Sequence, residues 1–152
     1  MSRYFPLFVN LEGKKIVVYG AGVVGSRRIL ALLDFGCELT VIAPGALPEV
    51  EKLAKEGRIL LKRAVYHPGE IGEDVCLVLA AVSDKEVNAR IAAECRGKRI
   101  PVNVSSDKSL CDFYFPGLAV KDDLVAGVTA GGMDHKRARA ASEAIRGVVE
   151  RL

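Results

Sequence analysis

Three glycines near the beginning of the chain have the spacing of a phosphate-binding turn. Gly20, Gly22 and Gly25 form the pattern G-x-G-x-x-G within residues 15–36, KIVVYGAGVVGSRRILALLDFG. In such a turn the first glycine permits a sharp bend, the second lets a pyrophosphate approach the backbone, and the third lets the helix pack closely on the strand. The N–H groups and the dipole at a helix start favour a diphosphate. The spacing therefore predicts a dinucleotide site, and the alternative is a tight turn without a ligand.

The residues around these glycines supply the context that the pattern requires. Residues 16–19 (IVVY) are apolar on both faces, which is typical of a central strand in a parallel sheet. A helix is expected to follow the third glycine and to end at Gly36, because glycine is favoured just beyond a helix C-terminus. The motif thus lies where a strand becomes a helix.

Further strands and helices alternate along the next part of the chain. Strands are expected at residues 38–43, 59–65, 75–81 and 100–104, with helices at residues 48–56 and from Ser83 to about Arg96. Pro44 and Gly45 are expected to end the second strand, and Ser83 with Glu86 to form a capping box. This alternation predicts an α/β, Rossmann-like fold with a parallel sheet in the order 3-2-1-4-5.

The pattern changes after Ser106. Residues 113–115, 118–120 and 124–129 predict short strands, with a turn at Asp122-Asp123, and a helix is expected from Asp134 onward. We therefore predict two parts, a nucleotide-binding domain of residues 1–112 and a small ββα element of residues 113–152. The second part is too short to fold alone, so it is expected to pack on the first or to make a dimer.

Composition and charge exclude several other classes of protein. The 152 residues are 50% hydrophobic and 6% aromatic, as expected for one α/β domain with a small appendage. A net charge of +3, with the bases spread among acids, gives no reason to expect a nucleic-acid partner. No apolar run approaches the roughly 20 residues of a membrane span, and the start of the chain does not resemble a signal peptide. We expect a cytoplasmic protein without a membrane partner.

The cysteines and histidines predict no metal site. Cys37, Cys76, Cys95 and Cys111 form no C-x-x-C pair, and no cluster has zinc or iron–sulfur spacing. They are expected to be free thiols that pack as small hydrophobic residues.

The predicted second strand ends without the acidic residue that commonly holds the adenosine ribose. Because residues 43–45 read APG, recognition is expected from backbone groups there. No arginine lies in this segment to hold a 2′-phosphate, so NAD is predicted over NADP. The end of the strand at residues 75–81 should border the nicotinamide, since it reaches the same edge of the sheet.

Five segments, in one order, carry a family resemblance. They are YFPLFVNLEGKKIVVYGAG from Tyr4, VIAP at Val41–Pro44, AAVSDKEVN at Ala80–Asn88, VNVSSDKSLCDFYFP at Val102–Pro116, and the glycine pair with a basic helix at Gly131–Arg139. Together they resemble precorrin-2 dehydrogenase, the NAD-binding domain of siroheme synthase. The resemblance implies a homodimer that oxidises precorrin-2 to sirohydrochlorin with NAD. Some members of the family also insert iron. Some relatives continue with a further helical segment, so we expect this chain to be either a short form or truncated.

The resemblance, with the glycine pattern, assigns roles to individual residues. The implied cofactor-binding residues are Gly20, Gly22, Val23, Val24, Gly25, Ala43, Pro44, Gly45, Ala80, Ala81 and Val82. The family usually has an aspartate, its proposed general base, where this chain has Ser106. A serine without a partner is a poor base, so Asp107 is the predicted proton acceptor, the alternative being a turn-capping residue.

Basic residues are candidates for binding the carboxylates of a tetrapyrrole. They are Arg27, Arg28, Lys136, Arg137 and Arg139, with His135 as a candidate contact to substrate or iron. The alternative for each is a solvated helix face. Two other functions stay open at this point: a sirohydrochlorin ferrochelatase, alone or bifunctional, and a non-catalytic module that binds NAD or tetrapyrrole.

Overall fold

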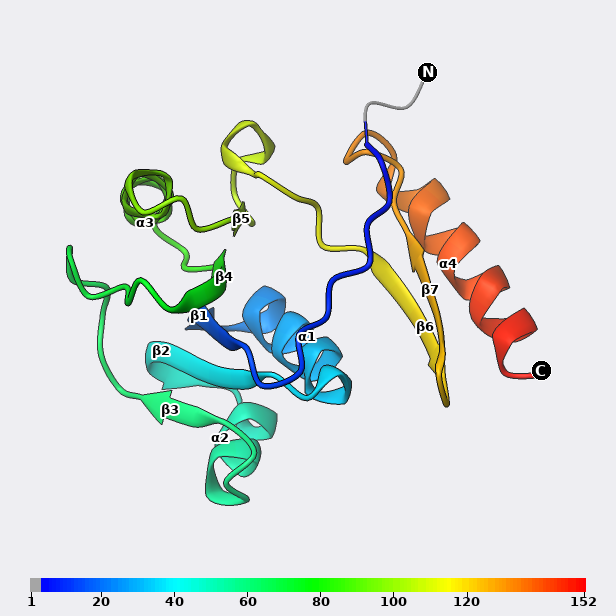
Figure 1. The fold of residues 1–152 in the computed structure, drawn as a ribbon, viewed down its shortest axis with the longest axis horizontal. Coiled ribbons are helices and arrows are strands. Elements are labelled where there is room, and N and C mark those ends of the chain that lie inside the picture. The colour runs from blue at the N-terminus through cyan, green and yellow to red at the C-terminus, as the bar shows by residue number, and fades with distance from the viewer. Residues whose placement is uncertain (1–3) are drawn as a thin grey trace. The chain divides into compact units, whose positions relative to one another are not determined.

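A computed structural model describes residues 4–152, which divide into two compact units. One unit is Asn10–Phe113, and the other contains Tyr114–Leu152 together with residues 4–9. Figure 1 shows the helices and strands of both. None of the described helices is long and apolar enough to cross a membrane.

The larger unit is built on a five-stranded parallel sheet. Its strands are β1 (Lys15–Ala21), β2 (Glu38–Ala46), β3 (Leu60–Lys62), β4 (Val75–Ala80) and β5 (Val102–Val104). They lie in the order β3-β2-β1-β4-β5, and every neighbouring pair is parallel. The predicted Rossmann-like class and strand order are confirmed.

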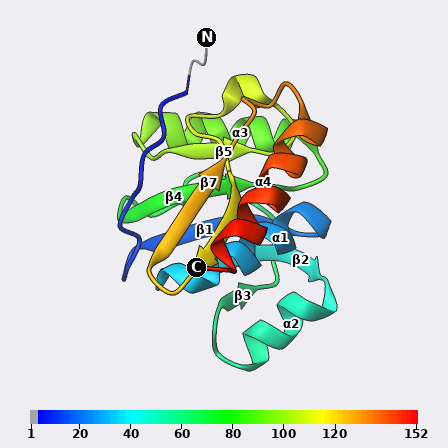
Figure 2. The same cartoon turned by 90° about the vertical axis from the view of Figure 1, so that its right-hand side faces the viewer.

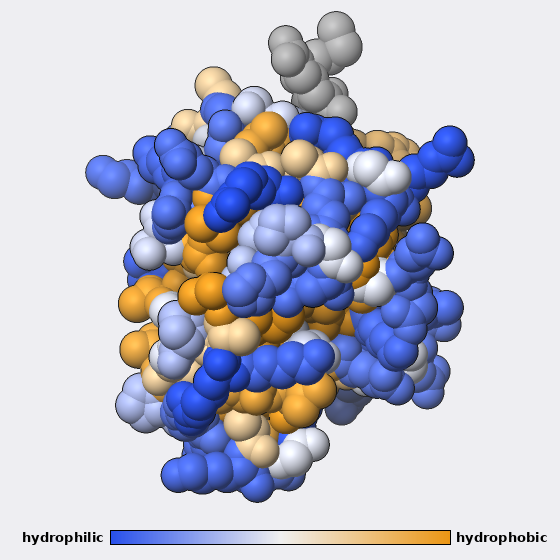
Figure 3. All heavy atoms as spheres, turned by 90° about the vertical axis from the view of Figure 1, so that its left-hand side faces the viewer, coloured by the Kyte–Doolittle hydropathy of each residue, from blue (hydrophilic) through white to orange (hydrophobic). Residues whose placement is uncertain are grey.

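Helices cover both faces of this sheet. They are α1 (Val23–Leu32), α2 (Pro48–Lys55) and α3 (Lys85–Gly97), with the 3₁₀ turns η1 (Leu33–Phe35) and η2 (Lys108–Leu110). Figure 1 shows α1 and α2 on one face and α3 on the other. Figure 3 turns the α3 side to the viewer and shows hydrophilic side chains over most of this face, with hydrophobic ones visible between them.

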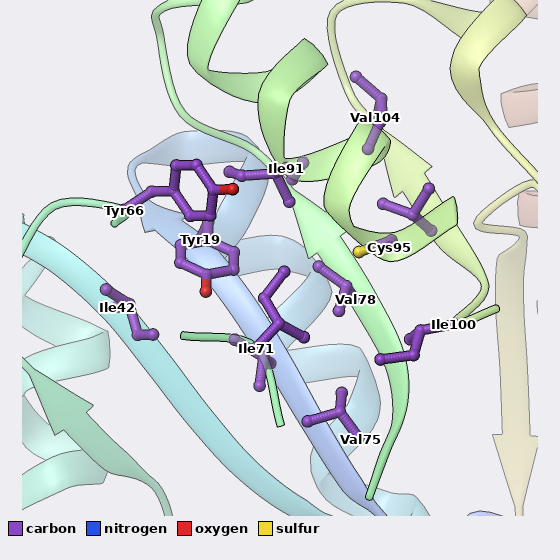
Figure 4. Packing of buried hydrophobic residues seen from close by; sticks show 14 residues of the cluster. Tyr19, Ile42, Tyr66, Ile71, Val75, Val78, Ile91, Cys95, Ile100 and Val104 are labelled. Carbon is purple, nitrogen blue, oxygen red and sulfur yellow. The ribbon is translucent and has the colours of Figure 1, made fainter. Parts of the chain in front are cut away.

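The core between the sheet and α3 is made of aliphatic side chains and, at one side of the cluster, two tyrosines (Figure 4). The rings of Tyr19 and Tyr66 meet edge to face, with 5.4 Å between their centroids, a favoured aromatic geometry. Cys95 is fully buried there, and burial raises the pKa of its thiol to about 12. This cysteine therefore packs as an apolar residue.

A carboxylate on α3 fixes the segment that leads into β4. Glu94 accepts hydrogen bonds from the Tyr66 hydroxyl at 2.6 Å, the Lys98 ammonium at 2.7 Å, and the backbone N–H groups of Gly69 and Ile71 at 2.9 and 3.1 Å. Burial opposes its ionisation, but these four donors outweigh burial and lower the pKa of Glu94 to about 2. The carboxylate thus holds residues 69–71 against α3.

The smaller unit contains an antiparallel pair, β6 (Gly117–Lys121) and β7 (Leu124–Val128), and the helix α4 (His135–Val149). Figure 2 shows α4 running along this pair. At Gly117 a Cβ atom would lie 2.7 Å from the Ser142 hydroxyl oxygen, so the glycine permits close packing of α4 on β6. Asp134 caps α4 by accepting from Arg137 N–H at 2.8 Å, as the sequence predicts.

Three local predictions are wrong. Residues 113–115 form no strand, because the Phe113 carbonyl accepts from the Asn103 side chain and Pro116 has no N–H to donate. Asp84, not Ser83, caps α3. Its carboxylate accepts from the backbone N–H groups of Glu86 and Val87. β2 continues through Pro44 and Gly45 to Ala46 instead of ending before them.

Candidate functional site

The three glycines of the first turn meet three different requirements. A Cβ atom at Gly20 would lie 2.3 Å from the Ala81 carbonyl oxygen, and φ there is +96°, a conformation that favours glycine. At Gly25 a Cβ atom would lie 2.1 Å from the Gly20 carbonyl oxygen. At Gly22 it would meet nothing within 4 Å. Two glycines are therefore required by the protein's own packing, whereas the space beside the third is open.

The N-terminus of α1 has no anionic group of its own. Gly22 is the N-cap, no side chain caps the helix, and its first turn contains no acidic residue. Val23 and Val24 are 59% and 45% exposed. The Ser26 hydroxyl fixes the helix to the turn by donating to the Ala21 carbonyl at 3.3 Å. Backbone N–H groups at such a helix start, combined with open space at Gly22, fit the pyrophosphate of a dinucleotide.

The end of β2 lies beside this turn. Ala46 pairs with Ala21 after a shift in register, and Leu47 N–H donates to the Ala21 carbonyl at 3.1 Å. Ala43 is buried, whereas Pro44 and Gly45 are exposed. A Cβ atom at Gly45 would meet nothing within 4 Å. The structure thus brings the predicted 43–45 segment next to the glycine turn as extended backbone.

The ends of β4 and β5 continue the same edge of the sheet on the other side of β1. Ala81 N–H donates to the Tyr19 carbonyl at 2.8 Å, and Ser105 N–H donates to the Ala80 carbonyl at 2.9 Å. Ala81 and Val82 are half-buried, and Ser106 is exposed. The predicted nicotinamide-side residues and the serine beyond β5 therefore follow one another along the edge that begins at the glycine turn.

Asp107 is the N-cap of η2. Its carboxylate accepts from the Ser109 hydroxyl at 2.6 Å and from Ser109 N–H at 2.9 Å. These two hydrogen bonds, in that order, hold the pKa of Asp107 below its ordinary value. The residue is a fully exposed, ionised carboxylate next to Ser106, and it has the capping role that the sequence left as an alternative.

The predicted basic residues fall into different surroundings. Arg27 is exposed on α1. Arg28 is half-buried and donates to the Asn103 side-chain oxygen, and burial lowers the pKa of its guanidinium. His135, Lys136, Arg137 and Arg139 are exposed on α4, in the smaller unit. Arg139 is also paired with Glu143 at 2.9 Å.

Sequence reasoning missed two buried polar side chains at this edge. Asn88 binds the backbone of Val82 and the Ser106 hydroxyl, and Asn103 joins Arg28 to the Phe113 carbonyl. Both are almost fully buried. A polar amide at an otherwise apolar position of a helix or strand is the signal that could have found them. Among the described residues, no group of three or more His, Cys, Asp or Glu side chains could hold a metal ion.

Residues 7–117 match the model of a protein family described as "Putative NAD(P)-binding". This chain belongs to that NAD(P)-binding family. The match spans β1 through β5 and therefore the whole edge that carries the glycine turn.

Curated relatives of this chain carry names that refer to siroheme biosynthesis. The chain is 32% identical over 143 residues to "Probable multifunctional siroheme biosynthesis protein HemA" of Ruminiclostridium josui, covering 93% of this chain and 28% of that protein. It is 37% identical over 130 residues to "Siroheme synthase" of Ectopseudomonas mendocina, covering 86% of this chain and 28% of that protein. The chain thus spans less than a third of the length of these relatives.

A solved structure described as "SirC, precorrin-2 dehydrogenase" has the same fold. It superposes with a TM-score of 0.77 and 21% sequence identity, over 95% of this chain and 71% of the other. With these relatives, the resemblance to the siroheme synthase NAD-binding domain is confirmed at the level of the family.

Proposed function

We propose that this chain is an NAD-dependent oxidoreductase that converts precorrin-2 to sirohydrochlorin. The observation that carries the proposal is the open space at Gly22, at an uncapped helix start, within a chain related to siroheme synthases. NAD⁺, when bound, supplies the acceptor for the two electrons that leave the tetrapyrrole.

The residues at the sheet edge would hold the cofactor along its length. Backbone N–H groups of Gly22, Val23 and Val24 would bind the pyrophosphate, since they lie at the start of α1. The exposed backbone at Pro44 and Gly45 would contact the adenosine ribose. NAD is proposed over NADP because that segment contains no arginine for a 2′-phosphate. Residues 80–82 would border the nicotinamide.

A proton must also leave the substrate, and Asp107 is the proposed acceptor. Like an ordinary aspartate it is ionised at neutral pH, and its pKa lies lower still, so the carboxylate has a lone pair that can accept a proton. Asp107→Asn separates this role from capping, because asparagine caps as well as aspartate. We expect kcat to fall about 100-fold or more in this variant, with the free energy of unfolding nearly unchanged.

The element of residues 113–152 is proposed to form a homodimer and to bind substrate. The basic residues of α4 are suited to the many carboxylates of a tetrapyrrole. No observation specifically favours iron insertion or a non-catalytic module.

An anaerobic assay tests the proposed function. Protein, NAD⁺ and precorrin-2 are mixed, and sirohydrochlorin absorbance is followed together with NADH absorbance. Stoichiometric formation of both is expected, at lower rate with NADP⁺. Absence of product at high enzyme concentration, from a protein that binds NAD⁺ in calorimetry, would refute catalysis.

A further inference from the structure

Asn88 joins two loops at the edge of the sheet. Its side chain is 0% exposed, and it makes three hydrogen bonds. The side-chain oxygen accepts from Val82 N–H at 3.2 Å, and the side-chain nitrogen donates to the Val82 carbonyl at 3.0 Å and to the Ser106 hydroxyl oxygen at 3.0 Å. One residue of α3 therefore ties the loop after β4 to the turn after β5.

The backbone of Val82 fixes which way the Asn88 amide points. A backbone N–H can only donate and a backbone carbonyl can only accept, so the amide oxygen must face the former and the NH₂ group the latter. In a flipped amide the NH₂ group would face the Val82 N–H, donor against donor, and the amide oxygen would face the Val82 carbonyl, acceptor against acceptor. The second proton of the Asn88 NH₂ group is therefore directed at Ser106.

This arrangement decides what the Ser106 hydroxyl can do. Its oxygen already accepts a hydrogen bond, and Asn88 is a neutral donor that cannot remove the hydroxyl proton. Ser106 is exposed at the edge of the sheet, just beyond β5, so its own O–H is available to an acceptor outside the protein. The hydroxyl is thus prepared to donate, not to act as a base.

We propose that Asn88 is a positioning residue that sets the Ser106 hydroxyl as a hydrogen-bond donor to an anionic group of the substrate. The proposal rests on the proposed function for the identity of that substrate, a carboxylate-bearing tetrapyrrole. Ser106 lies next to the segment that borders the cofactor, because Ser105 N–H is bound to the end of β4. Asn88 touches neither cofactor nor substrate and acts through Ser106.

The hydrogen bond can be tested by NMR without any ligand. Ser106→Ala removes the acceptor at an exposed position and should leave the fold intact. We expect one of the two Asn88 side-chain NH₂ protons to shift and to exchange with solvent about tenfold faster or more, while the other, held by Val82, keeps its resonance. Ser105→Ala, a matched exposed serine, should change neither. Unchanged Asn88 resonances in Ser106→Ala would overturn the proposal.

Steady-state kinetics test the donor role. Ser106→Ala should raise KM for precorrin-2 about tenfold or more, because a hydrogen bond to a charged group is lost, while kcat stays within about threefold. Asn88→Ala should reproduce this rise, and the double variant should add little, because Asn88 acts through Ser106. The dissociation constant for NAD⁺, measured by calorimetry, should not change in Ser106→Ala.

The other outcomes are equally decisive. A 100-fold loss of kcat in Ser106→Ala with unchanged KM would make Ser106 a base and overturn the donor role. If Asn88→Ala does not fold, the amide resonances and the Ser106→Ala kinetics still decide the proposal. Absence of turnover in the wild type refutes the proposed function and with it the substrate role of Ser106, whereas the amide resonances separately decide whether Asn88 holds this serine.

Discussion

Replacing Gly22 with alanine separates cofactor binding from folding at the glycine turn. The added methyl group meets no protein atom within 4 Å, and φ at this residue is −80°, which alanine adopts without strain. The methyl group would instead occupy the space through which a pyrophosphate approaches α1. We therefore expect weaker NAD⁺ binding from a protein that is folded normally.

The size of the effect follows from the hydrogen bonds that would be lost. A hydrogen bond to a charged group contributes about 1.5–3 kcal/mol. Losing one such bond corresponds to about 10- to 150-fold weaker binding. The free energy of unfolding should fall by no more than about 1 kcal/mol, which is the usual cost of placing alanine at an N-cap.

Calorimetric titration with NAD⁺ and chemical denaturation measure the two quantities. Two glycines give matched controls. Gly97→Ala, at the end of α3 with open space around it, should leave NAD⁺ binding unchanged. Gly25→Ala should instead destabilise the fold by about 3 kcal/mol or more, because its methyl group would meet a backbone carbonyl at 2.1 Å. If Gly22→Ala binds NAD⁺ as tightly as the wild type, the phosphates do not lie against this residue and the assigned site is wrong.

Three further outcomes are expected. Stability should fall between pH 4.5 and 2, since Glu94 has a lower pKa in the folded protein than when unfolded and must be protonated below that range. Between pH 7 and pH 3 this carboxyl should account for a loss of about 2 kcal/mol in denaturation experiments. That part of the loss should be missing in Glu94→Gln, which should itself be about 2 kcal/mol less stable at pH 7. Tyr66→Phe should lower stability by about 1 kcal/mol, and an unchanged denaturation midpoint would contradict the assigned bond to Glu94. Arg28→Lys should destabilise the larger unit by about 1 kcal/mol through lost bonding to Asn103, and a rise in KM without loss of stability would instead favour direct substrate contact.

The sheet could be predicted because its determinants are local and repeated. Apolar runs such as residues 75–80, and the glycines that follow the first two helices (Gly36 and Gly57), mark successive βα units, and right-handed crossovers then leave few strand orders. The glycine turn was predictable for the same reason, since its sequence and its geometry lie within one short segment.

The rest of the site depends on contacts between residues that are distant in sequence. Asn88 and Ser106 are 18 residues apart, and no periodicity connects them. The extension of β2 through Pro44 and Gly45 depends on pairing with Ala21, which outweighs the usual tendency of this dipeptide to end a strand. Asp84 and Ser83 have similar propensities to cap a helix. Only the backbone angles that the loop adopts decide which of the two neighbours becomes the N-cap, so the sequence alone did not distinguish them.

The smaller unit joins residues from both ends of the described chain. The Tyr4 and Tyr114 hydroxyls lie 3.2 Å apart, and their rings meet edge to face across a separation of 110 residues in sequence. Bringing such distant residues together in a disordered polymer costs loop-closure entropy, and a compact intervening segment lowers that cost. During refolding, we therefore expect the tyrosine pair to assemble late, after the parallel sheet has formed.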